Sequence, residues 1–160
     1  MLTYEIQEKP GFTVMAVAET FQPETGYQEI PKFWQRVLSM ENCPLWGVYG
    51  VCLEEAGNGG EFEYLIADPV EPGKPVPEGL ILKEIPTATW AVFPCHGPIP
   101  ESLQALNTRI WSQWLPNCQT HRLAMNMTIE MYAPPAERPE DSYCEIWIPV
   151  EPVEAPATDG

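Results

Sequence analysis

One short stretch near the C-terminal end combines an acid and an aromatic side chain at a spacing that suits ligand binding or proton transfer: Thr128-Ile129-Glu130-Met131-Tyr132. Strand residues alternate between the two faces of a sheet, so Glu130 and Tyr132 share one face and Ile129 and Met131 share the other. If Ile129 and Met131 pack in the core, Glu130 and Tyr132 face a groove. A glutamate in the middle of an antiparallel strand more often faces solvent, and this alternative remains open at this point.

Further aromatic side chains are expected near this acid. Glu145 and Trp147 share a face of the last predicted strand, and Tyr49 occupies the position in the first half of the chain that matches Tyr132. An aromatic face attracts a cation by about 0.5–2 kcal/mol, and a partly buried carboxylate is costly to leave unpaired. We therefore expect a pocket in which a flat, lipophilic cation meets Glu130. Tryptophans at helical spacing, such as Trp111, are also frequent core residues, and this alternative stays open.

The charge balance narrows the classes of partner. The 160-residue chain has 8 basic and 23 acidic residues, a net charge of −15. Such a surface repels phosphate backbones and anionic lipids, so we expect neither nucleic-acid nor membrane binding. It attracts cations, although an acidic surface also serves solubility alone.

Cysteine and histidine spacing favours neither a metal site nor a cofactor. None of the five cysteines forms a C-x-x-C pair, and the two histidines, His96 and His121, lie far apart, so we expect reduced thiols and no metal. No Ser-His-Asp set or nucleophile elbow is apparent, and an enzyme is not the first expectation. Without a signal peptide or an apolar run of roughly 20 residues, the chain is expected to be cytoplasmic.

Hydrophobic periodicity predicts the elements of the first half. The first eight or nine residues and residues 12–19 favour strands. Apolar residues three and four apart predict a helix from Tyr27 that ends at Asn42-Cys43-Pro44. Two strands follow, over residues 46–53 and 62–67, joined by a glycine-rich loop.

A proline-rich connector over residues 68–79 should be stiff and extended. The second series is strand, strand, helix, strand and strand, over residues 80–85, 87–93, 100–115, 127–133 and 143–150. We expect one domain over residues 1–150, with halves of about 1–67 and 80–150, and a mobile tail over residues 151–160.

The two halves are similar to one another. Three pairs of segments occur in the same order: Glu8-Lys9-Pro10 with Glu84-Ile85-Pro86, Phe33-Trp34 with Ile110-Trp111, and residues 46–49 with residues 129–132. The last pair matches Tyr49 to Tyr132 and Gly47 to Glu130, so only one half has the acid. We therefore predict an α+β fold of duplicated strand-helix-strand-strand modules, related by a pseudo-twofold, with antiparallel sheets and a central pocket. The acid is expected to lie away from the centre of this pocket.

Five stretches of the second half occur in an order and spacing typical of one family. They are PTATWAVF (86–93), His96-Gly97-Pro98, IWSQWLP (110–116), IEMY (129–132) and CEIWIPV (144–150). Over about residues 80–150 the chain resembles the GyrI-like effector-binding family, the domain attached to AraC-type and MerR-type regulators such as BmrR and Rob. The first half fits this family more loosely.

The resemblance implies a two-module α+β fold in which a buried glutamate meets cationic, aromatic ligands. It transfers this role to Glu130 and, more weakly, to Glu145. The aromatic walls that it implies are Trp90, Tyr49, Tyr132, Trp147 and Trp111. No helix-turn-helix segment precedes the domain, so direct DNA binding is not expected, and the chain is similar to stand-alone members on integron gene cassettes.

Two other functions remain open. Some relatives of this fold hydrolyse small electrophiles, and Glu130 with Tyr132 could act as base and hydrogen-bond donor if burial raises the glutamate pKa. A namesake of the family binds DNA gyrase, and an acidic surface suits competition with DNA for a protein partner that the sequence does not identify.

Overall fold

The computed structural model describes residues 2–22, 24–40, 45–54, 62–71, 73–98, 101–133 and 137–153. The elements of this part of the chain are β1 (Glu5–Lys9), β2 (Phe12–Phe21), α1 (Gly26–Leu38), β3 (Tyr49–Glu54), β4 (Phe62–Pro69), β5 (Ile81–Ile85), β6 (Ala88–His96), α2 (Glu101–Arg109), the π-helical segment η1 (Ile110–Trp114), α3 (Leu115–Asn117), β7 (His121–Leu123), β8 (Met127–Tyr132), the 3-10 helix η2 (Pro139–Asp141) and β9 (Tyr143–Pro152). The predicted α+β class is confirmed.

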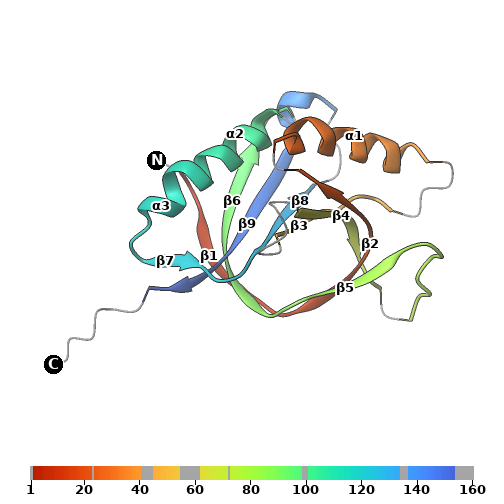
Figure 1. Cartoon of the computed structure of the whole chain (residues 1–160), viewed down its shortest axis with the longest axis horizontal. Coiled ribbons are helices and arrows are strands. Elements are labelled where there is room, and N and C mark those ends of the chain that lie inside the picture. Colours follow the sequence, from red (N-terminus) through yellow and green to blue (C-terminus); the bar gives the residue numbers. More distant parts are fainter. Residues whose placement is uncertain are drawn as a thin grey trace.

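The described strands form one antiparallel sheet in the order β1-β6-β9-β8-β3-β4-β2-β5, and β7 pairs with β9. The chain passes from β1 to β2 and from β5 to β6 at two bends that lie side by side, since the Gly11 amide donates to Thr87 Oγ1 at 2.8 Å. Proline precedes each of these residues and cannot donate to a ladder, which is why the ladder is interrupted there. The strands curve strongly as a result (Figure 1).

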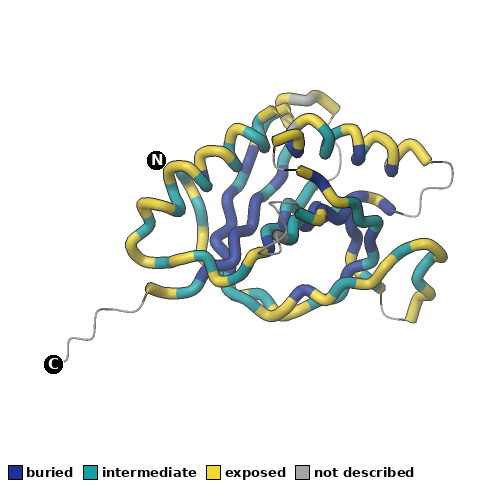
Figure 2. The backbone as a smooth tube through the Cα atoms, viewed as in Figure 1, coloured by how far each residue is buried: buried dark blue, intermediate teal, exposed yellow. Residues whose placement is uncertain are grey.

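Both long helices cover the same side of the sheet (Figure 1). Beneath α1, the apolar stripe with Phe33 and Val37 packs on Ile66 and Phe21. Beneath α2 and η1, Leu103 and Ile110 pack on a second cluster, which includes β6 and β9. A third cluster fills the opposite, concave side of the sheet. The buried stretches of the central strands lie between these layers (Figure 2).

The strand pairings define which residues of the two halves correspond. The two proline segments are 76 residues apart, and with this offset Ala16 of β2 corresponds to Val92 of β6. Across the paired strands, the row Ala16–Ala67–Tyr49 of the first half therefore corresponds to the row Val92–Trp147–Ile129 of the second half. Tyr49 therefore corresponds to Ile129, and Gly50 to Glu130. Gly50 and Glu130 are also direct partners, so the pseudo-twofold passes through this pair. The expected match of Tyr49 to Tyr132 is wrong by three residues, and an odd shift places a strand residue on the opposite face.

The expected connector begins later than residue 68, because β4 continues through Pro69. Asp68 is buried inside the strand, where its carboxylate accepts hydrogen bonds from the amides of Trp46, Gly47 and Val48 at 2.6, 2.9 and 3.0 Å. Gly47 has a φ of 84°, a backbone conformation that residues other than glycine rarely adopt. Asp68 thus fixes the segment that leads into β3.

Replacing Asp68 with alanine should lower the free energy of unfolding by about 1–3 kcal/mol, because buried amides lose their acceptor. Asp68→Asn should cost less, since the amide side chain retains one acceptor oxygen. Urea denaturation measures both changes. Glu71→Ala is the control, since Glu71 is an exposed acid that pairs with exposed Lys74. An Asp68→Ala variant as stable as this control would contradict the role of Asp68.

The remaining differences from the predicted elements are local. β7 was not expected, and the helix predicted over residues 100–115 changes at Ile110 from α to π geometry. The glycine-rich loop, the expected stop of the first helix at residues 42–44 and residues 154–160 of the tail lie outside the described residues. Within the described part, none of the helices has the length and apolar character of a membrane span.

Candidate functional site

Glu130 lies on the helix-covered face of β8, at the centre of the sheet. Its Oε1 accepts two hydrogen bonds, from the Tyr64 hydroxyl at 2.5 Å and from the Tyr132 hydroxyl at 2.6 Å. The indole Nε1 of Trp34 donates to the Tyr64 hydroxyl at 2.9 Å, and the Trp34 ring meets Tyr132 edge to face at 5.0 Å. The carboxylate is therefore fixed from one side by a connected set of aromatic residues.

Gly50 explains how this arrangement fits. A Cβ atom at Gly50 would collide with the Tyr64 hydroxyl and would lie 2.8 Å from Glu130 Oε1. The first half thus has no side chain where the second half has the acid. In this space, the tyrosine of one half meets the glutamate of the other.

The second oxygen, Oε2, has no hydrogen-bond partner among the described residues, whereas Oε1 has two. Burial raises the pKa of Glu130, and the hydrogen bonds from Tyr132 and Tyr64 oppose that rise. Burial, together with the negative charge of Glu130, raises the pKa values of Tyr64 and Tyr132 well above the usual range. Both phenols are therefore donors, and Oε2 is the oxygen available to a ligand.

Glu130 opens into a cavity of about 510 Å³ between the two modules. The first module contributes Gly26, Ile30, Cys52, Phe62 and Tyr64, and the second contributes Asn107, Thr108, Trp111, Ser112, Asn126, Met127, Thr128 and Glu130. Among these described residues Glu130 is the only acid, and none is basic. The first module contributes mainly apolar and aromatic side chains, and the second contributes most of the hydroxyl and amide groups; such a mixture is typical of small-molecule sites.

Trp111 enters the cavity wall from η1. Its indole Nε1 donates to Asn107 Oδ1 at 3.0 Å, one turn earlier. Single π-helical turns inside α-helices are frequent at functional sites. Trp111 is thus the one expected wall tryptophan that lines this cavity.

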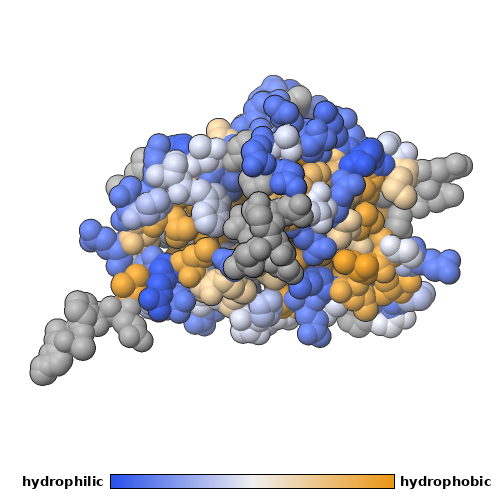
Figure 3. Space-filling model, in the orientation of Figure 1, coloured by the Kyte–Doolittle hydropathy of each residue, from blue (hydrophilic) through white to orange (hydrophobic). Residues whose placement is uncertain are grey.

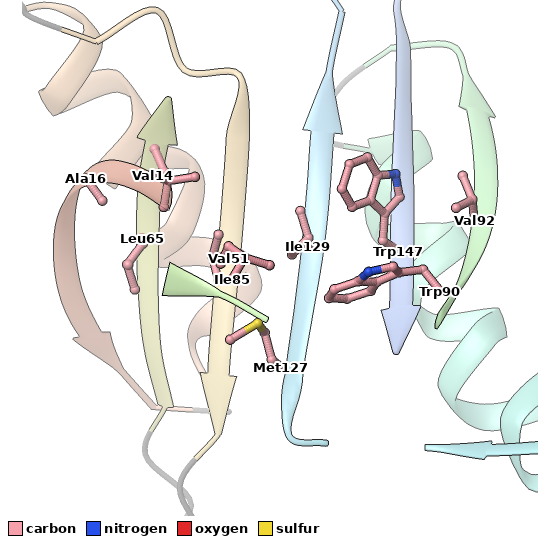
Figure 4. Close-up of a cluster of buried hydrophobic side chains, with 11 residues drawn as sticks. Val14, Ala16, Val51, Leu65, Ile85, Trp90, Val92, Met127, Ile129 and Trp147 are labelled. Atoms are coloured by element: carbon pink, nitrogen blue, oxygen red, sulfur yellow. The ribbon is translucent and has the colours of Figure 1, made fainter. Parts of the chain in front are cut away.

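Four other expected site residues lie on the opposite face of the sheet, and their expected place beside Glu130 is corrected here. Trp90, Trp147 and Tyr49 belong to the concave cluster, with ring centroids 6.0 Å apart for Trp90–Trp147 and 5.7 Å for Tyr49–Trp147. Figure 4 shows Trp90 and Trp147 beside Ile129, the neighbour of Glu130 that points away from the cavity. The physical reason is the alternation of β8 and β9, because Ile129 and Trp147 are direct partners.

Glu145 lies on that opposite face as well. Its two oxygens accept hydrogen bonds from the Tyr143 hydroxyl at 2.6 Å and from Trp147 Nε1 at 2.8 Å. The ammonium of Lys9 lies 4.4 Å from the centroid of the Trp147 ring. Glu145 and Tyr143 therefore form a second Glu–Tyr pair, which lies outside the cavity. Glu145 provides a matched control for Glu130.

Sequence reasoning missed Tyr64, Phe62, Cys52 and Ile30. Tyr64 and Phe62 are two residues apart on β4 and share the face that α1 covers, a spacing that was visible in the sequence. Their approach to Glu130 depends on the strand order β8-β3-β4. This order brings Tyr64 close to Glu130, although the two residues are 66 positions apart in the sequence. Tyr132 was expected at the site, and it contacts Glu130 directly.

In the described residues, no group of three or more His, Cys, Asp or Glu side chains is placed to bind a metal. The site thus consists of a carboxylate, two phenol donors and a partly open cavity. It can bind an organic molecule and place a negative charge against it.

Comparisons with known proteins identify the family of the chain. Residues 5–150 match Cass2, the family of integron-associated effector binding proteins. The transcriptional regulator BrlR of Pseudomonas aeruginosa is 32% identical over 117 residues, which are 68% of this chain and 42% of BrlR. The chain therefore spans less than half the length of that regulator.

Solved structures show the same fold at lower identity. SAV2435, determined with tetraphenylphosphonium bound, superimposes with a TM-score of 0.77 at 22% identity, covering 94% of each chain. The integron cassette protein VCH_CASS2 from the mobile metagenome of Vibrio cholerae has a TM-score of 0.70 at 18% identity, covering 92% of this chain and 95% of that one. Since the family match spans nearly the whole chain, the protein belongs to the Cass2 family of integron-associated effector-binding proteins.

Proposed function

We propose that this protein binds lipophilic, cationic, drug-like compounds in the cavity between its two modules, with Glu130 as the counter-ion. The observation that carries the proposal is the carboxylate itself, since it is half-buried in the wall of a partly aromatic cavity, has Oε2 unpartnered among the described residues, and has no basic residue in the described lining. An ionised carboxylate in such a place is stabilised by an entering positive charge.

The size and lining of the cavity support a ligand of moderate size. A volume of about 510 Å³ falls within the range of roughly 300–1,000 Å³ for small-molecule sites. Phe62, Tyr64 and Trp111 offer aromatic surface to the ligand. A single carboxylate matches a single positive charge. Tetraphenylphosphonium, the compound bound to SAV2435, has this combination of aromatic surface and one charge.

Titration with tetraphenylphosphonium and with the neutral triphenylphosphine oxide separates the charge from the aromatic surface. Binding can be followed by tryptophan fluorescence, because Trp111 lines the cavity, and confirmed by calorimetry. We expect the cation to bind at least about tenfold more tightly, which corresponds to about 1.4 kcal/mol. Equal affinities, or no binding of the cation, would refute the proposal.

Affinity for tetraphenylphosphonium should depend on pH through Glu130. Burial raises the pKa of Glu130 above 4.5, so the folded protein retains this proton more strongly than the unfolded chain does. The proton stabilises the fold below the unfolded pKa, and this contribution is lost as the pH rises through the folded pKa. A bound cation favours the carboxylate, so affinity should rise through the same pH range and then level off.

Calorimetric titrations between about pH 4 and pH 8 measure this dependence. The ligand has a permanent charge, so the change in affinity comes from the protein. In Glu130→Gln the dependence over this range should largely disappear. A wild-type affinity that does not change with pH would show that Glu130 does not titrate on binding.

A further inference from the structure

Two buried cysteines on neighbouring strands form a thiol pair beside the binding site. Cys95 of β6 and Cys144 of β9 are direct partners in the antiparallel ladder. Partner residues point to the same face, and both thiols belong to the apolar cluster beneath α2. Cα atoms of partner residues lie about 4.5 or 5.5 Å apart, and both separations suit a disulfide.

The remaining cysteines of the described residues lack this arrangement. Cys52 and Cys118 are both partly exposed and lie on β3 and after α3. On the neighbouring strand β8, Cys144 also pairs with Tyr132, whose hydroxyl donates a hydrogen bond to Glu130. The pair is therefore a distinct feature of the second module, one strand away from the cavity.

We propose that Cys95 and Cys144 are a redox modification site, at which a small hydroperoxide converts the two thiols to a cross-strand disulfide. The Cys95 sulfur attacks one oxygen of the hydroperoxide, the O–O bond breaks, and Cys95 becomes a sulfenic acid while an alcohol, or water from hydrogen peroxide, leaves. The Cys144 sulfur then attacks the Cys95 sulfur. The sulfenic hydroxyl leaves with the Cys144 proton as water, so the peroxide gains the two electrons that the thiols lose.

The two thiols are not equivalent, which gives this order of steps. Cys95 is 6% exposed and Cys144 is 1% exposed, so a small oxidant reaches Cys95 first. A hydrogen bond between the thiols lowers the pKa of Cys95 and raises that of Cys144, while burial raises both. Cys95 thus has the more reactive sulfur, and Cys144 is the resolving thiol.

The test is peptide mapping of the folded protein after brief treatment with hydrogen peroxide and alkylation of the remaining thiols. Trypsin leaves Cys95 in residues 84–109 and Cys144 in residues 123–160. We expect these peptides to be joined, with the loss of two hydrogens. Closure of this long loop should raise the melting temperature by roughly 5–15 °C, reversibly with dithiothreitol.

Two variants make the result specific. In Cys144→Ala, Cys95 should stop at a sulfenic acid that dimedone traps. In Cys118→Ala, which removes a more exposed thiol outside the pair, the cross-link should form as in the wild type. The proposal fails if both thiols of the pair stay free after Cys118 is fully oxidised, or if the link forms only once the protein has lost its native tryptophan fluorescence. These readouts require no ligand, so they are independent of the proposed function.

Discussion

Replacing Glu130 with glutamine should weaken tetraphenylphosphonium binding by about 30-fold, which corresponds to about 2 kcal/mol. Glutamine preserves the shape of the side chain and retains one acceptor oxygen for Tyr64 and Tyr132, but it removes the charge at Oε2. The fold should be retained or slightly stabilised at neutral pH, because a buried charge is removed. Isothermal titration calorimetry measures the affinity, and urea denaturation checks the fold.

The matched control is Glu145→Gln. Glu145 lies on the opposite face and accepts hydrogen bonds from Tyr143 and Trp147, so the same substitution there changes net charge equally. Affinity should change by less than about twofold, since a half-buried charge on the opposite face, outside the cavity, acts on the ligand only through screened, long-range attraction. If both variants lose affinity to the same extent, the overall charge of the protein, and not the cavity carboxylate, attracts the cation.

Replacing Gly50 with alanine should lower the free energy of unfolding by about 3 kcal/mol, at the upper end of the usual range for overpacking a core. The new Cβ would meet the Tyr64 hydroxyl and would lie 2.8 Å from Glu130 Oε1. Gly50 pairs with Ile66 on one side and with Glu130 on the other, so the backbone has little room to move away. Because the carboxylate must shift, affinity for tetraphenylphosphonium should also fall by about tenfold.

A double-mutant cycle with Tyr64→Phe tests the cause. Tyr64→Phe removes the oxygen that the new Cβ meets first, so the two substitutions together should cost less than the sum of their separate effects. Urea denaturation of the wild type, both single variants and the double variant provides the coupling energy. Strict additivity would show that the cost of Gly50→Ala arises elsewhere, for example from the alanine backbone conformation.

The sequence was sufficient to predict the α+β class, the antiparallel pairing and the acid in the middle of a strand. Period-two alternation places Glu130 and Tyr132 on one face, and the structure shows both on the helix-covered face, with the cavity where the modules meet. Trp111 was also expected, and it lines this cavity. These features depend on local periodicity and on duplication, both of which can be recognised in the amino-acid sequence.

The other aromatic positions could not be predicted, because they depend on strand register. Tyr49 was matched to Tyr132 by similarity of sequence, whereas the ladder matches Tyr49 to Ile129. A shift of three residues moves a side chain through the sheet. The role of Gly50 could not be predicted for the same reason, since a glycine opposite an acid is recognised only once the strand pairing of Gly50 with Glu130 is known.

The position of the acid on the symmetry axis of the sheet could not be predicted for the same reason. The pseudo-twofold passes through the pair of Gly50 and Glu130, so the carboxylate lies at the centre of the duplicated sheet. Two glutamates there would place like charges side by side in a buried site, which is strongly unfavourable. Glycine in one half and glutamate in the other is a physically consistent solution.

The chain therefore has two aromatic groups with an acid, on opposite faces of one sheet. Exposed apolar side chains are also present elsewhere, including Ile81 and Leu82, and apolar surface gathers over β2 and β5 in Figure 3. Position relative to the sheet, rather than aromatic content, thus distinguishes the proposed site from the rest of the molecule.

A crystal structure of the protein with tetraphenylphosphonium tests the central claim most directly. We expect the phosphonium between α1 and α2, with phenyl groups against Phe62 and Trp111 and with Glu130 Oε2 as the nearest carboxylate oxygen. A ligand seated instead on the concave side, against Tyr49 and Trp147 with Glu145 as its nearest acid, would contradict it.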